Sequence, residues 1–228
     1  MNTILELRGI NKLYGKEIKA QVLYDISLRF KKGSFNSIIG QSGSGKSSLL
    51  NIIGTLDKPT SGQVIINGQN VEDMSNNQLA RLRNNTIGFV FQFHYLLPEF
   101  TTLENVLIPY EIKNGKVTKE IIQKAEEYLR LVGLENVKNN LATKMSGGEQ
   151  QRTAIARALI NEPEIILADE PTGNLDSEST KTIYELLRNI NEKYGTTFLV
   201  ITHDKNIAQM TDRIIEMKDG RIHRDITK

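Results

Sequence analysis

The sequence of 228 residues contains no cysteine. Disulfide bridges, cysteine-ligated zinc, iron–sulfur clusters and thiol catalysis are therefore excluded. No apolar run approaches the roughly 18–20 residues that a membrane-spanning helix requires. The N-terminus also lacks the apolar stretch of a signal peptide, because Glu6 and Arg8 place charges there. We expect a cytoplasmic chain that reaches any membrane only through a partner.

A strong net charge is also missing, because 29 Lys and Arg residues stand against 27 Asp and Glu residues, which leaves +2. This near balance gives no reason to expect a protein that coats nucleic acid, so we expect no nucleic-acid partner. A chain of this length buries enough surface to fold without disulfides or metals.

The spacing of apolar residues predicts a strand-rich first part and alternating helices and strands in the last part. Strands are predicted at residues 3–7, 22–30, 35–39, 64–66, 165–168 and 198–201. Helices are predicted at residues 121–132, 155–159 and 183–190. The last two strands are apolar on both faces, which indicates a parallel sheet covered by helices. In such sheets ligands bind beyond the carboxyl ends of the strands.

A phosphate-binding loop is predicted between the strand at 35–39 and a helical run. The pattern GxxxxGK[ST] is matched by Gly40, Gln41, Ser42, Gly43, Ser44, Gly45, Lys46 and Ser47, and Ser48 follows it. The glycines let backbone N–H groups point at phosphate oxygens, and the helix N-terminus adds partial positive charge. Lys46 would reach the β- and γ-phosphates, and the Ser47 hydroxyl would bind Mg²⁺. The flanking strand and helix argue against a chance match in a turn.

Polar residues follow both apolar strands of the last part. Asp169 is placed to hold Mg²⁺, directly or through a water. Glu170 is placed to orient or deprotonate a water that attacks the γ-phosphate. His203 follows the second strand, where a neutral imidazole could donate to a phosphate oxygen or steady Glu170. A polar turn and a surface histidine are the alternatives, and the phosphate loop in the same chain favours catalysis.

A second anion site is predicted at the start of a later helix. Ser146 and Glu149 form a capping box there, and Gly147 and Gly148 lie between them. Two glycines in a first turn reduce helix propensity, but they allow a ligand to approach the backbone. Because the chain already has one phosphate loop, we infer that another copy presents the phosphate bound here. The alternative is a well-capped helix without a ligand.

These motifs, in order and spacing along essentially the whole chain, resemble those of ABC-transporter ATPase subunits. On that resemblance, residues 40–47 are the Walker A loop, residues 146–150 the signature motif, and Asp169 and Glu170 the Walker B aspartate and catalytic glutamate. A DNA-repair ATPase would carry coiled-coil insertions or a second ATPase domain, and a small-molecule kinase would lack the signature helix.

The resemblance also gives roles to residues that the patterns alone do not single out. It implies that Gln92 is the Q-loop glutamine, which touches Mg²⁺ and senses a membrane partner. It implies that residues 174–176 are the D-loop and that His203 is the switch histidine. Tyr14 resembles the aromatic residue that stacks on adenine, although a tyrosine near any turn would look the same.

The fold implied is α/β: a P-loop (RecA-like) core with an N-terminal antiparallel β subdomain and an inserted α-helical subdomain. Residues 1–228 would form one ABC ATPase domain, with the core at about 1–92 and 152–228 and the helical subdomain at about 93–151. ATP would hold two copies together as a head-to-tail homodimer, each ATP lying between the phosphate loop of one subunit and the signature helix of the other. Closure around ATP would move integral membrane subunits.

The signature motif departs from the usual LSGGQ at two positions. Met145 replaces leucine, which conserves volume, and Glu149 replaces glutamine. Glu149 retains the capping geometry but adds a negative charge near an anion site. Glutamate also occurs there in the subgroup that this sequence resembles, so we do not interpret it as loss of activity.

The stretch Gln92–Val106 indicates how a membrane partner docks. Its aromatic and leucine side chains predict a groove for an integral membrane (permease) subunit, and packing inside the helical subdomain is the alternative. With residues 171–176 it resembles the lipoprotein-releasing ATPases and the macrolide exporters. No membrane domain is fused to the motifs, so we expect a separate subunit, peripheral at the cytoplasmic face of the inner membrane. A macrolide or antimicrobial-peptide exporter and a cell-division regulator remain alternatives to lipoprotein release.

Overall fold

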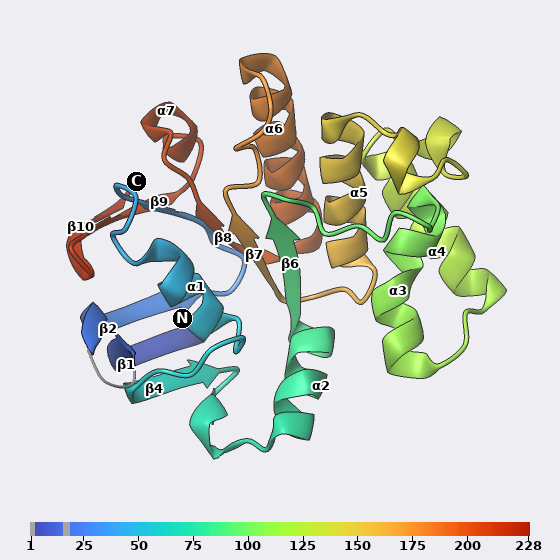
Figure 1. Cartoon of the computed structure of the whole chain (residues 1–228). Coiled ribbons are helices and arrows are strands. Elements are labelled where there is room, and N and C mark those ends of the chain that lie inside the picture. The colour runs from blue at the N-terminus through green and yellow to red at the C-terminus, as the bar shows by residue number, and fades with distance from the viewer. Residues whose placement is uncertain (1–2, 16–18) are drawn as a thin grey trace.

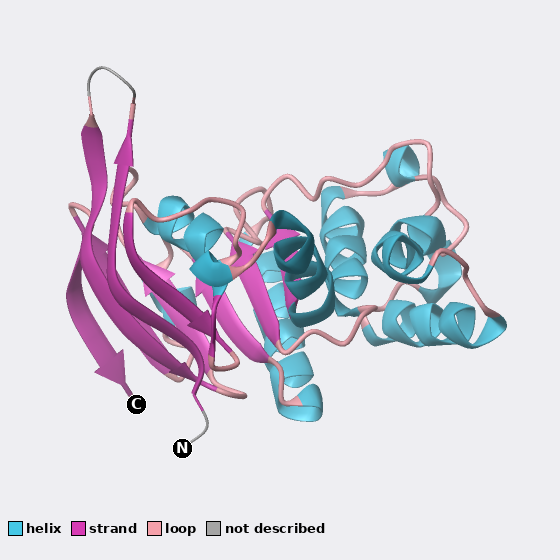
Figure 2. Ribbon diagram, turned by 90° about the horizontal axis from the view of Figure 1, so that it is seen from below, coloured by secondary structure: helices cyan, strands magenta, loops and turns pink. Residues whose placement is uncertain are grey.

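The computed structural model describes residues 3–15 and 19–228. Its strands form two sheets, and helices lie on and beside the larger one (Figure 1). Figure 2 shows the strands gathered at one end of the molecule and most helices at the other. Within the described ranges, no helix has the length and apolar character needed to span a bilayer.

The elements alternate along the chain as expected for an α/β fold. The strands are β1 (Thr3–Tyr14), β2 (Ala20–Lys31), β3 (Phe35–Ile39), β4 (Ser61–Ile66), β5 (Gln69–Asn70), β6 (Ile87–Phe91), β7 (Ile165–Asp169), β8 (Thr197–Ile201), β9 (Arg213–Lys218) and β10 (Arg221–Thr227). The α-helices are α1 (Lys46–Ile53), α2 (Asn76–Thr86), α3 (Thr102–Asn114), α4 (Lys119–Leu131), α5 (Gly147–Leu159), α6 (Ser177–Tyr194) and α7 (Lys205–Ala208). Short 3₁₀ turns are η1 (Val71–Asp73), η2 (Glu135–Val137) and η3 (Ala142–Lys144).

The larger sheet has the strand order β10-β9-β3-β8-β7-β6. Neighbours from β9 to β6 pair in parallel, and β10 pairs antiparallel with β9. Every residue of β3 and β8 is buried, which explains their continuous apolar sequences, since helices cover both faces of a parallel sheet. The predicted parallel sheet is confirmed.

The smaller sheet has the order β2-β1-β4-β5 and is antiparallel throughout. This confirms the predicted N-terminal antiparallel β region. Its inward side chains, such as Leu5, Ile10 and Leu23, share one hydrophobic core with Leu49 of α1 and Ile38 of β3. The smaller sheet therefore packs against the helix that follows the phosphate loop.

A second hydrophobic core joins α3, α4, α5 and α6 to β7 and β8. Ile121 and Leu129 of α4, Ile155 of α5 and Leu187 of α6 contribute to it, at the spacing that predicted these helices. Helix α5 also contacts β6 and continues past the predicted boundary at residue 151. The division of the chain into core and helical subdomain at residues 93 and 151 therefore stays a prediction.

Candidate functional site

The parallel strands bring the predicted site residues to one edge of the larger sheet. Gly40 follows β3, Glu170 follows β7, His203 follows β8 and Gln92 follows β6. The Glu170 N–H donates to the Ile201 carbonyl at 3.1 Å, which continues the β7–β8 pairing beyond the end of β7. This bond sets Glu170 beside the segment that carries His203.

The phosphate loop turns sharply between β3 and α1, and its glycines make that turn possible. Gly40 has φ 156° and a Cβ there would clash with the Met217 carbonyl. Gly45 is the N-cap of α1 at φ 94°, where no side chain of the described residues caps the helix. The first N–H groups of α1 therefore stay available for an anion, and the helix dipole favours one.

The Lys46 side chain folds back over the loop. Its ammonium donates to the carbonyls of Gly40 at 2.8 Å and Gln41 at 2.9 Å. An ammonium has three N–H donors, so one remains for a phosphate oxygen. The predicted role of Lys46 fits this geometry.

A cavity of about 460 Å³ lies over this loop. It is lined by Val22, Gly40, Ser42, Gly43, Gly45, Lys46, Ser47, Ser48, Glu170 and His203. The structure thus brings the loop, the glutamate and the histidine together as the sequence predicts. Val22 on β2 was not predicted, because an apolar residue in a strand carries no sign of ligand contact. The described lining includes neither Gln41 nor Ser44, and Ser44 is buried.

The predicted catalytic residue Glu170 has a strained backbone conformation. Glu170 has φ 44°, a left-handed conformation that costs a non-glycine residue about 1–3 kcal/mol. Its carbonyl accepts from the Gly173 N–H at 3.0 Å, which helps hold the turn. Its Oε2 atom lies 3.4 Å from Nδ1 of His203. Strain of this kind gathers at functional sites, where the surrounding structure maintains it.

Ser47 and Asp169 form a second pair beside the cavity. The Ser47 hydroxyl donates to Asp169 Oδ1 at 3.4 Å, a long contact that leaves oxygen lone pairs free. Burial raises the pKa of Asp169, so a nearby cation would favour its charged form.

The donors fit Mg²⁺ that arrives with a nucleotide. Hydroxyl and carboxylate oxygens suit this ion, which keeps waters and takes phosphate ligands alongside one or two carboxylates. In the part of the chain that the structure describes, no group of three or more His, Asp or Glu side chains could hold a metal. Ser47 and Asp169 therefore need phosphate oxygens to complete a coordination shell.

Gln92 is tied to the predicted D-loop. Its Nε2 donates to Asn174 Oδ1 at 3.3 Å, and Asn174 Nδ2 donates to the Gln92 carbonyl at 3.3 Å. A Cβ on Gly173 would lie 2.7 Å from Gln92 Nε2, so the glycine makes room for the amide. Gln92 thus follows β6, the strand beside β7, and it is not among the described residues that line the cavity.

Tyr14 lies at the end of β1, outside the cavity lining. Its hydroxyl donates to Asp57 Oδ2 at 2.8 Å, and the Lys12 ammonium lies 4.7 Å from the ring centroid. The side chain is 40% exposed. Its stacking on adenine stays a prediction.

The predicted signature helix is α5, and its capping box is present. Ser146 Oγ accepts from the Glu149 N–H at 3.3 Å, while Glu149 Oε2 accepts from the Ser146 N–H and hydroxyl at 2.8 Å each. These bonds hold the pKa of Glu149 below its usual value. Met145 is buried, and its sulfur accepts from the Thr102 hydroxyl at 3.0 Å. Both departures from the usual signature are therefore accommodated.

The glycines of the signature helix have no packing reason inside this chain. Among the described atoms, a Cβ on Gly147 would come no closer than 3.8 Å to Leu175, and one on Gly148 no closer than 3.6 Å to Arg152. Helix α5 and α1 lie on opposite sides of β6 (Figure 1), and residues 146–149 do not line the described cavity. A contact from outside the chain would explain two glycines that helix stability disfavours.

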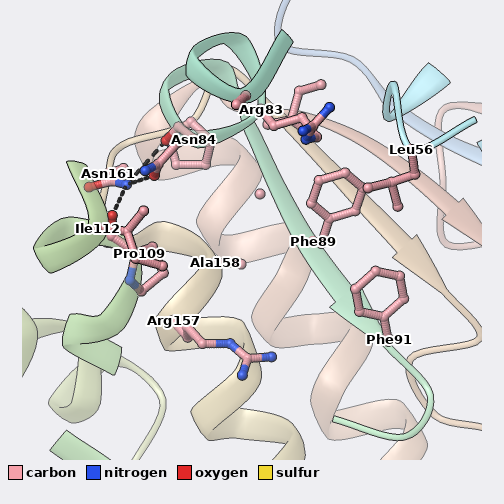
Figure 3. Close-up of a pocket in the computed structure, with 14 residues that line it drawn as sticks. Leu56, Arg83, Asn84, Phe89, Phe91, Pro109, Ile112, Arg157, Ala158 and Asn161 are labelled. Carbon is pink, nitrogen blue, oxygen red and sulfur yellow. Dashed lines mark hydrogen bonds between the residues drawn. The ribbon is translucent and has the colours of Figure 1, made fainter. Parts of the chain in front are cut away.

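A second cavity, of about 390 Å³, is largely apolar and lies where β6 faces α2, α3 and α5 (Figure 3). We call it the docking groove. It is lined by Leu56, Ala80, Arg83, Asn84, Ile87, Gly88, Phe89, Phe91, Pro109, Ile112, Arg157, Ala158, Asn161 and Pro163. The Phe89 and Phe91 rings stack with centroids 5.6 Å apart. Asn161 Nδ2 donates to the carbonyls of Asn84 and Pro109 at 3.1 Å each, which joins α2 to α3.

Residues 23–173 match the ABC transporter family. The chain belongs to this family. Among its relatives, the lipoprotein-releasing system ATP-binding protein LolD 1 of Rhodopseudomonas palustris is 48% identical over 224 residues, 97% of this chain and 99% of that protein. The LolD protein of Aquifex aeolicus is 50% identical over 229 residues, 100% of both chains. The dimeric ATP-binding cassette MJ0796 in a post-hydrolysis state with ADP and Pi gives a TM-score of 0.90 at 44% identity, with 98% of each chain covered.

As an ABC transporter ATPase, the chain binds and hydrolyses ATP, and the predicted α/β P-loop fold is confirmed. A second dimeric structure of MJ0796 gives a TM-score of 0.91 at 45% identity. The cavity over residues 40–47 combines the groups that bind phosphate, namely free N–H groups, Lys46 and the helix dipole.

Replacing Lys46 with alanine should weaken ATP binding at least about 100-fold, or about 2.7 kcal/mol, because a charge-assisted hydrogen bond to phosphate is lost. Isothermal titration with ATP would measure the change, and circular dichroism would verify folding. Lys58→Ala, at an exposed position, is the matched control and should bind normally. Unchanged affinity in the Lys46 variant would contradict the phosphate-loop assignment.

Proposed function

We propose that this ABC ATPase powers the release or export of lipoproteins from the inner membrane, acting as a peripheral subunit at its cytoplasmic face. The observation that carries this proposal is the likeness to LolD proteins from two distant bacteria. It reaches 48–50% identity and spans nearly the full length of both partners in each comparison. A likeness of this extent covers nearly the whole chain and not the ATPase motifs alone.

The cavity residues support an in-line attack of water on the γ-phosphate. Glu170 takes a proton from the attacking water, and the bond between the γ-phosphorus and its bridging oxygen breaks to give ADP and phosphate. His203, 3.4 Å away, orients the Glu170 carboxylate. Lys46 directs its remaining donor to the phosphates. Tyr14 stacks on the adenine.

Ser47, Asp169 and Gln92 would hold Mg²⁺ together with the nucleotide. The ion supplies charge neutralisation on the phosphate oxygens when bound. Ser47 and Asp169 already adjoin each other, and Gln92 approaches from the end of the neighbouring strand β6.

The active form would be a head-to-tail homodimer that forms with ATP. Gly147 and Gly148 leave the α5 N-terminus open to a partner, and Ser146 and Glu149 stand beside them. The similar cassette MJ0796 is dimeric with ADP and Pi bound. Each ATP would then lie between residues 40–47 of one subunit and the signature helix of its partner.

Glu170→Gln should lower ATP hydrolysis by about 100- to 10,000-fold, because the general base is lost, while ATP binding remains. The variant should therefore accumulate as a dimer in saturating ATP and Mg²⁺, as measured by size-exclusion chromatography with light scattering. The double variant with Ser146→Arg is the control, since the large cation blocks the composite site and should return the monomer. A monomeric Glu170→Gln protein would argue against the shared site.

The permease would bind in the docking groove. The described lining includes Phe91, directly before the predicted stretch Gln92–Val106, and no residue of that stretch. The exposed rings of the stretch lie beside it in the sequence: Phe93 is 67% and Tyr95 64% exposed, and Tyr95 packs edge-on against Phe91. Arg83 and Arg157 line the groove, and the ion pairs that arginines form in the described chain involve neither. An apolar helix that carries an acidic side chain would complement this surface.

The function is tested by what the trapped protein binds in the cell. We would express tagged Glu170→Gln in the native host, purify it from solubilised membranes with ATP, and identify its partners by mass spectrometry. Integral subunits with a large periplasmic domain and bound lipoprotein are the expected result. Recovery of a peptide or drug exporter subunit would leave the ATPase role intact and contradict lipoprotein as the cargo. A division protein, or no membrane protein, would refute the transporter role.

The groove predicts a second outcome in the same purification. Ile112 is 74% exposed on the groove rim, so Ile112→Asp should fold normally yet lose the permease subunits, because a charge would be buried against an apolar helix. Ile226→Asp, on β10 and 50% exposed, is the matched control and should retain them. Equal recovery of permease with both variants would place docking elsewhere.

A further inference from the structure

Arg157 is a partly buried cation for which the ATPase chemistry provides no role. It lies in the last turn of α5, well beyond the signature motif, and Figure 3 shows its guanidinium projecting away from the helix into the groove region. Burial lowers its pKa to about 10. A charge so poorly solvated needs specific partners, because an unpaired buried ion is strongly destabilising.

The partners of Arg157 are two consecutive backbone carbonyls. Nη2 donates to the carbonyl of His94 at 2.5 Å, and Nη1 donates to that of Tyr95 at 2.6 Å. A planar guanidinium is suited to such a two-pronged contact, since its donors have fixed directions. Arg157 therefore clamps one peptide segment in one orientation.

That segment has an unfavourable backbone. His94 has φ 55° and Tyr95 φ 49°, so two successive non-glycine residues are left-handed. Such residues persist only where the surrounding structure holds them. Within the turn, the His94 N–H donates to the Phe91 carbonyl at 3.2 Å. The Tyr95 ring packs edge-on against Phe91, with centroids 5.3 Å apart.

The strained turn begins two residues after Gln92, on the loop that leaves β6. We propose that Arg157 is a positioning residue for Gln92: it clamps the His94–Tyr95 turn and thereby fixes the loop that presents the Gln92 amide. This inference rests on the proposed role of Gln92 at Mg²⁺. The same guanidinium lines the docking groove, so a segment bound there touches the group that holds the loop. Arg157 thus connects the docking groove to the nucleotide.

The first test measures the loop itself, in the isolated subunit without nucleotide. Arg157→Gln should speed hydrogen exchange of the His94 and Tyr95 amides about tenfold, because the turn opens more often. Arg157→Lys keeps the charge but loses the planar pair of donors. Its exchange rates at these amides should lie between those of the unmodified protein and of Arg157→Gln. Arg83→Gln removes the other groove arginine, whose Nη1 donates to the Thr55 carbonyl at 3.0 Å, and should leave these amides unchanged. Unchanged exchange in both Arg157 variants would overturn the proposal.

A rescue separates clamping from a general role of Arg157 in helix packing. Glycine adopts positive φ without strain, so His94→Gly should make the turn less dependent on the arginine. Adding His94→Gly to Arg157→Gln should restore most of the lost protection. If exchange stays fast in the double variant while α5 itself exchanges faster, Arg157 acts through packing of α5 and the proposal is wrong.

The second test connects the turn to the nucleotide site. The Mg²⁺ concentration for half-maximal ATP hydrolysis should rise in Gln92→Ala and, by a smaller factor, in Arg157→Gln, and His94→Gly should reverse only the latter. An effect of Gln92→Ala without one of Arg157→Gln would refute this inference and leave the proposed function standing. No effect of Gln92→Ala would refute the metal role of Gln92 and, with it, the positioning role of Arg157.

Discussion

In the larger sheet, β3, β8, β7 and β6 pair in parallel, so four segments far apart in the sequence end at one edge. Each of these strands therefore brings the residues at its carboxyl end to this edge: the phosphate loop, the acidic pair, His203 and Gln92. The register matters as much as the order, because a slip of one residue turns every side chain to the opposite face. Asp169 is paired with Ile201, and the bond from Glu170 to Ile201 extends that register into the site.

The site is built from local conformations that would be unfavourable elsewhere. Glu170 and the His94–Tyr95 turn are left-handed without glycine, and the signature helix begins with two glycines that weaken it. Neighbouring residues stabilise the left-handed conformations. The hydrogen bond from the Glu170 N–H to the Ile201 carbonyl holds Glu170, and the two hydrogen bonds from Arg157 hold the turn. For the two glycines no such close contact lies among the described residues, and the contact proposed above is with another subunit.

Continuous apolar runs made β3, β7 and β8 predictable to within about one residue, because burial on both faces leaves a plain signal. Strand β6 was missed because Gly88 interrupts its apolar run. A Cβ on Gly88 would lie 2.7 Å from the Ala158 carbonyl, so the close packing of α5 leaves no room for a side chain at this position. Helix α3 was missed because Pro109 lies inside it and its apolar residues form no single stripe.

The sequence could name Lys46, Glu170 and His203, which line one cavity, because each follows a recognisable strand or loop. Gln92 follows the missed strand and was found only through family resemblance. The clamp by Arg157 depends on a contact between α5 and a loop far away in the sequence, and on two φ angles. No local pattern reports such a contact, so only three-dimensional structure could reveal it.

Asn161 fastens α2 to α3 through the carbonyls of Asn84 and Pro109, and α3 in turn contacts α5. The walls of the docking groove therefore cannot separate without breaking these partly buried hydrogen bonds. A force applied at the groove would therefore act on α2, α3 and α5 together. Helix α5 runs from the groove residues Arg157 and Ala158 back to its N-cap Ser146, so a rigid movement of α5 at the groove would also displace the predicted signature motif.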